Sequence, residues 1–308
     1  MRSITWPKRA CQIALVLFGI PALARGASGQ PRSDERARSE NLTQALVSLN
    51  SSYQRAGPRA RSALVTQMLA TSAERRRLLA SIIESDPEHV LRVALSPELR
   101  ASLPAAVRTN AEQHVELEGT IEVLQEDYAN GARLRHFLHT DGTRLSLQFA
   151  TTPPPLLTGD RVRVRGVRLD TTLALQSGTT SLQTVATTAL KNTFGEQRTL
   201  VLLVNFQDNP VQPYTRLYAE DVVFTTTSNF DREASYLQTW LTGNVFGWFT
   251  IAMSGTVCDT LTLAGLAKQA ATAAGVNISL YTRYVYAFPK NACTWWGMGT
   301  VGGYPSQS

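Results

Sequence analysis

The spacing of apolar residues changes twice along the chain, and each change marks a different kind of secondary structure. Between residues 41 and 103, apolar side chains recur every three or four positions, which is the period of an amphipathic helix. From Val115 onwards they alternate with polar residues, as in a strand that is buried on one face. Residues 198–208 form a nearly continuous apolar run, typical of a buried strand in an α/β sheet. The sequence therefore predicts a multi-domain α+β chain.

The first region is predicted to contain several separate helices. Gly57-Pro58 should end the first helix, and Ser72 should open a new one a short distance further on. Ser96-Pro97 supplies an N-cap followed by a proline at the first helical position. The polar residues ahead of this region, from 25 to 40, are predicted to be a disordered linker.

The second region, residues 111–176, is predicted to be a small β-barrel or sandwich. Asp141-Gly142 lies between two alternating segments and supplies the chemistry of a tight hairpin turn. Several short strands at close spacing fit an OB-like barrel, a fold that binds oligonucleotides or sugars in some proteins. The Ser/Thr-rich residues that follow, 177–195, are predicted to be a linker to the next region.

Two arginine-rich stretches have a structural and a functional interpretation. The run Arg75-Arg76-Arg77 is interpreted as a solvated helix face, with a docking surface as the alternative. The alternating arginines of the β region could follow a phosphate backbone, or could form the solvent face of a strand whose valines face the core. We favour the second, because no aromatic residue lies among them, whereas grooves that bind single strands usually combine both types. These residues are Arg161, Arg163, Arg165 and Arg168.

The third region reads as β-α-β-α-β, which predicts a sheet with helices packed on it. A helix should follow the first strand, from Ser228 to about Trp240, with Phe230 and Leu237 on its buried face. The next strand is expected near residues 245–253, and an alanine-rich helix should end at Gly275. A last strand precedes the glycine-rich segment at the end of the sequence.

The N-terminal residues 1–24 have the three parts of a secretory signal peptide. A positively charged start is followed by the apolar run 10–20 and by the cleavage pattern Ala22-Leu-Ala24. The apolar run is too short for a membrane span, which needs about 20 residues. Cleavage after Ala24 removes three cations and lowers the net charge from +6 to +3. We therefore expect a secreted protein, with no membrane anchor after cleavage and no nucleic acid as partner.

Two cysteines, Cys258 and Cys293, remain once the signal peptide with Cys11 is removed. An even pair in an exported protein favours a disulfide, because the compartment is oxidising. The alternative is a pair of buried thiols.

The candidate catalytic groups do not form a complete site in the sequence. His136 and His139 have a spacing seen in metal ligands, but positions three apart on a strand point to opposite faces. Ser254 and Ser306 have no histidine nearby in the sequence, and no Gly-x-Ser-x-Gly motif is present. The sequence also contains no His-Glu-x-x-His motif. From the chemistry of its residues alone, the chain has no complete active site.

Several segments nevertheless resemble a known family. The segments "NTFGEQRTLVLLVNFQDNP", "NFDREASYLQTWLTGNVFGWFTIAM" and "YTRYVYAFPKNACTWWGMGTVGGYPSQ" resemble the gametolysin family of secreted zinc metallopeptidases. The segments "VELEGTIEV" and "LLTGDRVRVRGVRL" resemble the β module that precedes the peptidase domain in bacterial relatives. The resemblance implies a signal peptide at 1–24, a helical pro-segment at 25–110, a β module with linker at 111–190 and a partial zincin-like peptidase domain at 191–308.

The resemblance implies zinc as the cofactor of the intact family and a peptide or protein as its substrate. In that family two histidines of a His-Glu-x-x-His helix bind the metal, and the glutamate acts as general base. We expect this chain to end before that helix, so no catalytic residue or zinc ligand is assigned, and this chain should neither bind zinc nor cleave peptides. What the resemblance does assign is an edge of the substrate cleft at Trp295, Trp296, Gly297, Gly299, Gly302 and Gly303. The two tryptophans could line a side-chain pocket or simply pack beside Cys293.

Two further expectations concern latency and the alternative function. No cysteine lies between residues 25 and 257, so a pro-segment cysteine cannot occupy the zinc. Inhibition by the pro-segment would have to be steric or use another ligand, such as His89. The alternative to a peptidase precursor is a secreted, non-enzymatic binding protein built on the OB-like module and a degenerate peptidase scaffold.

Overall fold

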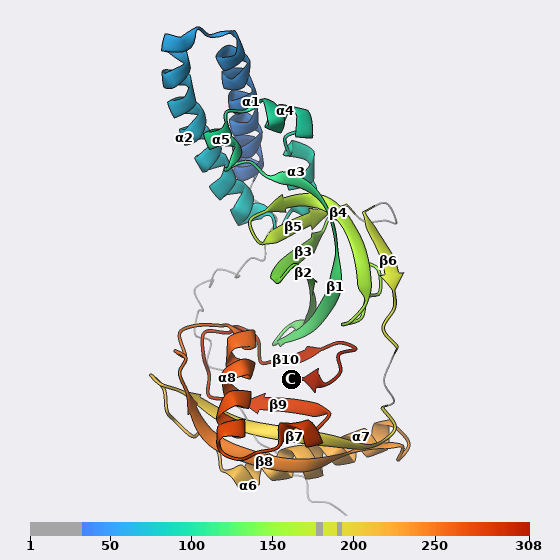
Figure 1. Ribbon diagram of the computed structural model, residues 1–308. Coiled ribbons are helices and arrows are strands. Elements are labelled where there is room, and N and C mark those ends of the chain that lie inside the picture. The colour runs from blue at the N-terminus through green and yellow to red at the C-terminus, as the bar shows by residue number, and fades with distance from the viewer. Residues whose placement is uncertain (1–32, 177–180, 190–192) are drawn as a thin grey trace, which may run out of the picture.

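The structure is a computed structural model that describes residues 33–176, 181–189 and 193–308. The predicted signal peptide, with Cys11, lies outside these residues. The chain is a mixed α+β protein with helices at one end and two β-sheets below them. The seven-stranded sheet lies in the middle of the molecule, and the four-stranded sheet lies at the end opposite the helices (Figure 1).

The helical region contains two long helices and three short ones. They are α1 (Ser33–Arg55), α2 (Pro58–Ile82), α3 (Pro87–Val93), α4 (Pro97–Ser102) and α5 (Ala105–Arg108). The long helices α1 and α2 lie side by side (Figure 1), and Leu46 and Met68 meet between them and the short helices in one buried cluster. Ser96 caps α4 as predicted, because its hydroxyl accepts a hydrogen bond from the backbone N–H of Leu99.

Two predictions for this region are wrong. Ser72 does not open a new helix, because α2 continues through it and its hydroxyl donates to the backbone carbonyl of Leu69, one turn earlier. Such a bond satisfies the hydroxyl inside a helix, so a serine is not by itself a boundary. Residues 33–40 of the predicted linker belong to α1, whereas its residues 25–32 lie outside the described residues. The polar side chains of residues 33–40 form ion pairs with the next helices, such as that between Arg36 and Asp86.

The middle region is a ring of five strands with one further strand, β6, beside it. The strands are β1 (Gln113–Tyr128), β2 (Gly131–Thr140), β3 (Thr143–Phe149), β4 (Arg161–Leu169), β5 (Thr172–Leu175) and β6 (Leu182–Ala186). Hydrogen bonds run β1-β2-β3-β5-β4, and β4 pairs again with the first half of β1, which closes the ring. The pair β3–β5 is parallel and the other pairs of the ring are antiparallel. Asp141-Gly142 forms the predicted two-residue turn, with φ of 47° and 71°.

The inward-facing side chains of this ring form one apolar core. Ile121, Val123, Leu145 and Leu173 are at most 1% exposed and pack in the same cluster as Val164. The predicted linker after residue 176 is partly wrong, because residues 182–186 form β6 and pair with β4.

The third region is a four-stranded sheet in the order β11-β9-β7-β8. Its strands are β7 (Gly195–Phe206), β8 (Thr239–Ile251), β9 (Arg283–Ala287) and β11 (Ser306–Gln307). The three long strands are parallel, as the β-α-β-α-β order predicts. Helix α8 (Thr260–Ala273) packs Leu263, Ala267 and Ala271 against one face of the sheet (Figure 1). Gly275 ends it with φ of 84°.

The prediction of a helix from Ser228 to Trp240 is wrong in its second half. The helical stretch ends at Ala234. It consists of three consecutive segments: α6 (Arg216–Asp221), the π-helix η1 (Val222–Thr227) and α7 (Ser228–Ala234). Tyr236 and Leu237 have φ of 54° and 66°, which stops the helix, and β8 begins at Thr239. Phe230 and Leu237 are 68% and 72% exposed and not buried. Pairing with β7 outweighs the helical spacing of the apolar residues here.

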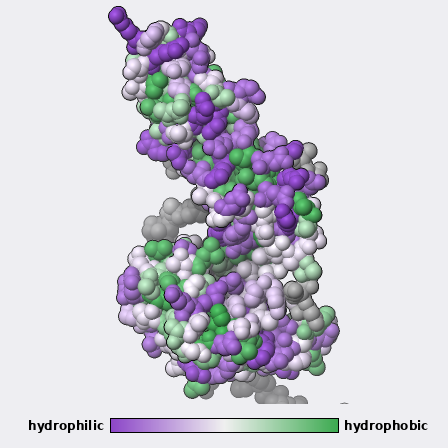
Figure 2. All heavy atoms as spheres, in the orientation of Figure 1, coloured by the Kyte–Doolittle hydropathy of each residue, from purple (hydrophilic) through white to green (hydrophobic). Residues whose placement is uncertain are grey.

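The exposed apolar side chains of the described residues lie mostly on this third region. In the view of Figure 2, the helical end is largely hydrophilic, whereas hydrophobic and neutral residues are more frequent on the part with the four-stranded sheet. The largest exposures among them are those of Leu217, Phe230, Tyr236, Leu237 and Trp296.

A short strand, β10 (Gly297–Thr300), connects the two sheets. It follows β9 in sequence, yet it pairs antiparallel with β1 and so becomes the seventh strand of the upper sheet (Figure 1). The partner residues are Leu124–Asp127, in the second half of β1. The glycine-rich segment is therefore held between the two sheets.

Candidate functional site

The candidate cleft edge, residues 295–303, begins just after the predicted disulfide. Cys258 and Cys293 are bonded, which confirms that prediction. Cys258 lies two residues before α8 and Cys293 two residues before Trp295, so the bond ties the start of the segment to the start of that helix. Asn291 also accepts a hydrogen bond from the backbone N–H of Cys293 through its side-chain oxygen. The disulfide and this hydrogen bond thus fix the position of the chain just before the candidate site.

The backbone of the segment is paired with β1 from Trp296 to Val301. The N–H of Trp296 donates to the carbonyl of Asp127 at 2.7 Å, and the N–H of Val301 donates to the carbonyl of Val123 at 2.9 Å. Between these two bonds, Gly297 and Gly299 lie opposite Asp127 and Gln125. The segment has the geometry of an added sheet strand.

The last two glycines of the segment contact the loop between β3 and β4. A Cβ at Gly302 would lie 2.9 Å from the Cβ of Leu157, and Gly302 has φ of 77°, so both space and backbone require glycine. A Cβ at Gly303 would lie 2.9 Å from the hydroxyl of Thr300. At Gly297 and Gly299 a Cβ would meet only ordinary contacts of 3.6 Å or more, so close approach does not require glycine there.

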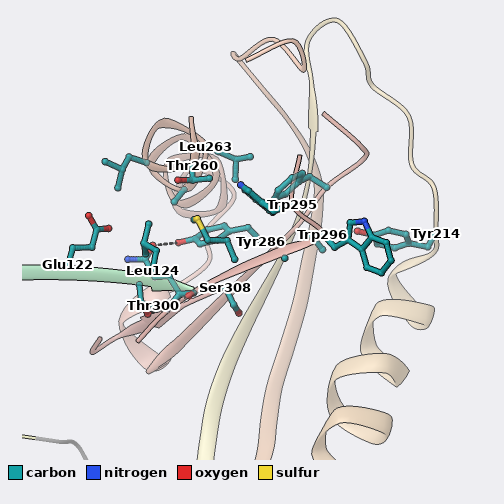
Figure 3. Close-up of a pocket in the computed structure, with 17 residues that line it drawn as sticks. Glu122, Leu124, Tyr214, Thr260, Leu263, Tyr286, Trp295, Trp296, Thr300 and Ser308 are labelled. Carbon is teal, nitrogen blue, oxygen red and sulfur yellow. Dashed lines mark hydrogen bonds between the residues drawn. The ribbon is translucent and has the colours of Figure 1, made fainter. Parts of the chain in front are cut away.

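A pocket of about 330 Å³ opens beside this segment, between β1, β9, β10 and α8. Its wall is mostly apolar and aromatic, and the side chains come from elements far apart in the sequence (Figure 3). Leu124 comes from β1, Leu263 from α8, Tyr286 from β9, and Met298 and Thr300 from β10. The volume lies in the range of small-molecule or side-chain sites, which are concave and mainly apolar with a few polar groups.

The two tryptophans have different environments. Trp295 packs edge-on against Phe288, with ring centroids 6.3 Å apart, and points toward Leu263 (Figure 3). Trp296 is 80% exposed and points away from α8, in the direction of Tyr214 (Figure 3). Both line the pocket. Trp295 therefore both packs against its neighbours and forms part of the pocket wall, whereas Trp296 lies at the rim of the pocket.

The polar groups of the pocket include two tyrosines and the carboxylate of Glu122. Tyr286 donates a hydrogen bond to the side-chain oxygen of Gln307 at 3.3 Å, and burial raises the pKa of this phenol. Burial also raises the pKa of Tyr214 to about 12. Both phenols therefore stay neutral at physiological pH. Glu122 accepts bonds from His139 and Arg144, at 2.9 and 2.8 Å, so its charge is compensated.

The histidines do not form a metal site. His136 is buried in edge contact with Phe149, and burial lowers its pKa, whereas His139 lies on the outside with Glu122. The two rings point to opposite faces of β2, as predicted. His89 is 1% exposed within the helical region and bonds to Ser39, so it is not free to bind a metal in the third region. Within the described ranges, no three His, Cys, Asp or Glu side chains lie close enough to hold a metal ion.

The arginines of β4 form a ladder of ion pairs with glutamates of β1. Arg163 lies 3.0 Å from a carboxylate oxygen of Glu118, and Arg165 lies 2.9 Å from one of Glu116. Arg161 pairs with Glu118 as well, at 2.8 Å. The strand alternates as predicted, with Val162 and Val164 facing the core between the exposed arginines.

The remaining serine candidates have structural partners. Ser254 donates to Asp208, which also accepts a bond from the backbone N–H of Gly255, so the two side chains close the loop after β7. Ser306 accepts a hydrogen bond from Arg283 at 2.8 Å. Neither serine lies near a histidine in the described structure. The sequence did not indicate the contribution of Leu124 and Tyr286 to the pocket, because it did not reveal that β1 reaches β9.

The comparisons with known proteins leave the family open. The sequence matches none of the protein-family models, and a search of curated proteins finds no significant match. Over the part of the chain that the structure covers, no helix is both long and apolar enough to cross a membrane. The resemblance to gametolysin therefore stays a prediction from the quoted segments.

Proposed function

We propose that the chain carries the pro-segment, an OB-like β module and the first part of the peptidase domain of a secreted zinc metallopeptidase similar to gametolysin. The observation that carries the proposal is the position of residues 295–303. They form an edge segment beside a parallel sheet, with an aromatic pocket of about 330 Å³ next to them. An extended peptide can bind such an edge through its backbone, and a pocket beside it can select a side chain.

The proposed OB-like assignment of the module rests on its strand order. A five-stranded ring β1-β2-β3-β5-β4, with β1 pairing β4 and β3 parallel to β5, is a Greek-key barrel of the kind that this fold describes. The proposed zincin-like assignment of the third region rests on three parallel strands backed by α8.

The described residues do not fit zinc, so no catalytic step is derived through it. In the proposed enzyme the metal would bind a His-Glu-x-x-His helix and activate water, and this motif is not part of the 308 residues. The role proposed for the present residues is to position the substrate: the segment 295–303 and Leu263 provide one wall of its binding site. We propose that this chain by itself neither binds zinc nor hydrolyses peptides.

The test is to sequence the reading frame beyond codon 308 and to assay its product. We expect a frame that encodes His-Glu-x-x-His, and a product that holds one zinc per chain and cleaves casein until a chelator is added. The 308-residue chain, purified in parallel, should contain no stoichiometric zinc. A frame without the motif, or a product with the motif but no chelator-sensitive cleavage, would argue against a peptidase.

The alternative proposal is a secreted binding protein without enzymatic activity. The pocket favours it, because its wall is complete with groups of this chain from β1, β9, β10 and α8. A binding protein should retain a peptide unchanged after long incubation, whether or not zinc is supplied. Mass spectrometry of the recovered peptide distinguishes the two proposals.

A further inference from the structure

Strand β1 pairs with two different strands, β4 and β10, along one of its edges. Its first half, residues 113–120, pairs with β4 and closes the barrel. Its second half, residues 124–127, extends beyond β4 and pairs with β10 on that same edge, while β2 occupies the other edge. The barrel therefore does not need residues 124–127 for its closure, and this end of β1 is free to cover another element.

The backbone of this end of β1 covers the edge of the candidate cleft. In an antiparallel pair, alternate residues exchange hydrogen bonds with the partner strand. Because Val301 donates to the carbonyl of Val123, the alternation places Gln125 in a bonded pair with Gly299. The N–H of Gln125 thus points to β10, and the N–H groups of its two neighbours point to β2. We propose that an extended peptide binds this same edge of β10, beside which the pocket opens.

The side chains of β1 also meet the pocket as those of a bound peptide would. Residues two apart on a strand share a face, and Glu122 and Leu124 both line the pocket. Leu124 is 5% exposed and lies opposite Thr300, in the apolar wall formed with Leu263 and Tyr286 (Figure 3). The side chains of Ile121 and Val123 lie on the other face of β1, in the barrel core. Leu124 is not part of that core. The side chain of Leu124 therefore contacts the pocket and not the barrel core.

We infer that residues 122–127 of β1 occupy the position of an extended peptide substrate, with Leu124 as the side chain selected by the pocket. The inference rests on the proposed function and adds a substrate class to it. The preferred substrate is a peptide that runs antiparallel to β10 and presents a medium-sized aliphatic residue where Leu124 lies. The β module acts as the internal occupant of this site, so substrate and module exclude each other.

The test compares Gln125→Pro with Gln125→Ala in the full chain. Proline removes the N–H of Gln125, one of those that point to β10, and leaves the β2 pairing of its neighbours, whereas alanine keeps that N–H. The side chain of Gln125 is exposed, so the alanine variant is a matched control. Hydrogen exchange of residues 296–301 reports whether β10 is uncovered. Exchange of β7, which is buried in the lower sheet, reports whether the fold is intact.

The probe is a fluorescent peptide with the sequence of residues 120–128, Thr-Ile-Glu-Val-Leu-Gln-Glu-Asp-Tyr. We expect Gln125→Pro to bind it about tenfold or more tightly than the wild type or Gln125→Ala, and replacement of the peptide leucine by aspartate to lose about tenfold, the range expected for burying one leucine. Leu124→Asp in the chain, which keeps every backbone donor, should increase binding in the same direction.

Faster exchange of β10 with peptide binding that depends on the leucine supports the inference. The inference is overturned if the exchange of β10 is unchanged in both Gln125→Pro and Leu124→Asp, or if the leucine and aspartate peptides bind equally. The β1–β10 contact would then be packing between modules. These outcomes are separate from the zinc and cleavage assay. If the chain binds the peptide but the longer gene product cleaves nothing, the proposed peptidase function is refuted. The proposed peptide-binding site would remain supported.

Discussion

Arg75 in α2 and Glu112, just ahead of β1, form an ion pair that is closed to solvent, with side-chain exposures of 2% and 0%. The guanidinium is bidentate, with Nη1–Oε2 and Nη2–Oε1 distances of 2.5 and 2.9 Å. Its other donors reach the hydroxyl of Thr43 and the carbonyl of Val93, and Glu112 also accepts from the N–H of Leu95. Burial alone would raise the pKa of Glu112, but the hydrogen bonds and charge of Arg75 outweigh it and lower the pKa. The helical region and the barrel are joined through this network.

Replacing Arg75 by methionine should destabilise the protein strongly. The substitution leaves the carboxylate of Glu112 buried without its partner, which costs about 3–5 kcal/mol. The matched control is Arg76→Met, because Arg76 pairs with Asp170 at the surface, with side-chain exposures of 40% and 47%. An exposed pair contributes about 0–1 kcal/mol. Urea unfolding followed by far-UV circular dichroism measures both, and equal midpoints for the two variants would contradict the argument.

The arginine run shows what the sequence could and could not predict. The spacing of apolar residues identified the helical region and the alternating strands, because these depend on local periods. The disulfide followed from an even pair of cysteines in a protein expected to be exported. It did not distinguish Arg75, which is buried, from its neighbours Arg76 and Arg77, because the difference comes from Glu112 at a separation of 37 residues. The pocket was missed for the same reason: it forms where β1 meets β10, far apart in the sequence.

Acidification should destabilise the helical region through His89. Its Nε2 lies 2.6 Å from the hydroxyl of Ser39 and its Nδ1 lies 2.6 Å from Nη2 of Arg92. The arginine donates to Nδ1, so the neutral ring carries its proton on Nε2 and donates to Ser39. Burial lowers the pKa of His89 below 6.5, and the charge of Arg92 lowers it further, against the opposite effect of Asp86 and Glu40.

The sign of the pH dependence follows from this depressed pKa. The unfolded chain takes up a proton at a higher pH than the folded one, so the stability is complete above pH 6.5 and decreases as the pH falls below it. We expect the unfolding midpoint of wild type to fall between pH 7 and pH 5, and that of His89→Gln to fall less. A wild-type midpoint that is constant across this range would contradict the prediction.

The ion-pair ladder of β1 and β4 should prevent the binding of nucleic acid. Arg161 and Arg163 share Glu118 as partner and Arg165 pairs with Glu116, so most of the positive charge of these three arginines is compensated. We expect no measurable binding of a labelled 20-nucleotide strand at physiological salt. The double variant Glu116→Gln/Glu118→Gln frees the arginines and should bind it, with an affinity that falls steeply as salt is raised. Fluorescence anisotropy measures both, and steeply salt-dependent binding by the wild type would refute the prediction.

Removal of the Cys258–Cys293 bond should loosen the candidate site and lower stability. The bond links residues 35 apart, and in the chain-entropy model a loop of this size is worth about 4 kcal/mol. The double variant to serine, compared with the wild type under oxidising conditions, should unfold at a lower urea concentration. Hydrogen exchange of residues 293–303 should accelerate more than that of β7. The argument fails if reduction with dithiothreitol lowers the wild-type midpoint no more than it does that of the serine variant.

Two glycines of the third region should respond to alanine in opposite directions. At Gly243 in β8 the backbone has φ of 149°, and a Cβ would lie 1.8 Å from the carbonyl oxygen of Thr199 in β7. Alanine there must move β7 or β8, and we expect a loss of about 3 kcal/mol or more from strain and overpacking together. At Gly265 in α8 no atom lies within 4 Å of a Cβ, and the position is exposed. Alanine should stabilise this helix by about 0.5–1 kcal/mol, because glycine loses more backbone entropy on folding.

The pair of variants tests the register of β7 with β8. A shift of one residue would turn Gly243 away from its position opposite Thr199 and remove the clash. Urea midpoints of Gly243→Ala and Gly265→Ala, measured against the wild type, give the two signs directly. If both substitutions stabilise the protein, β8 does not pair with β7 in this register, and the sheet that supports the candidate site must be arranged differently.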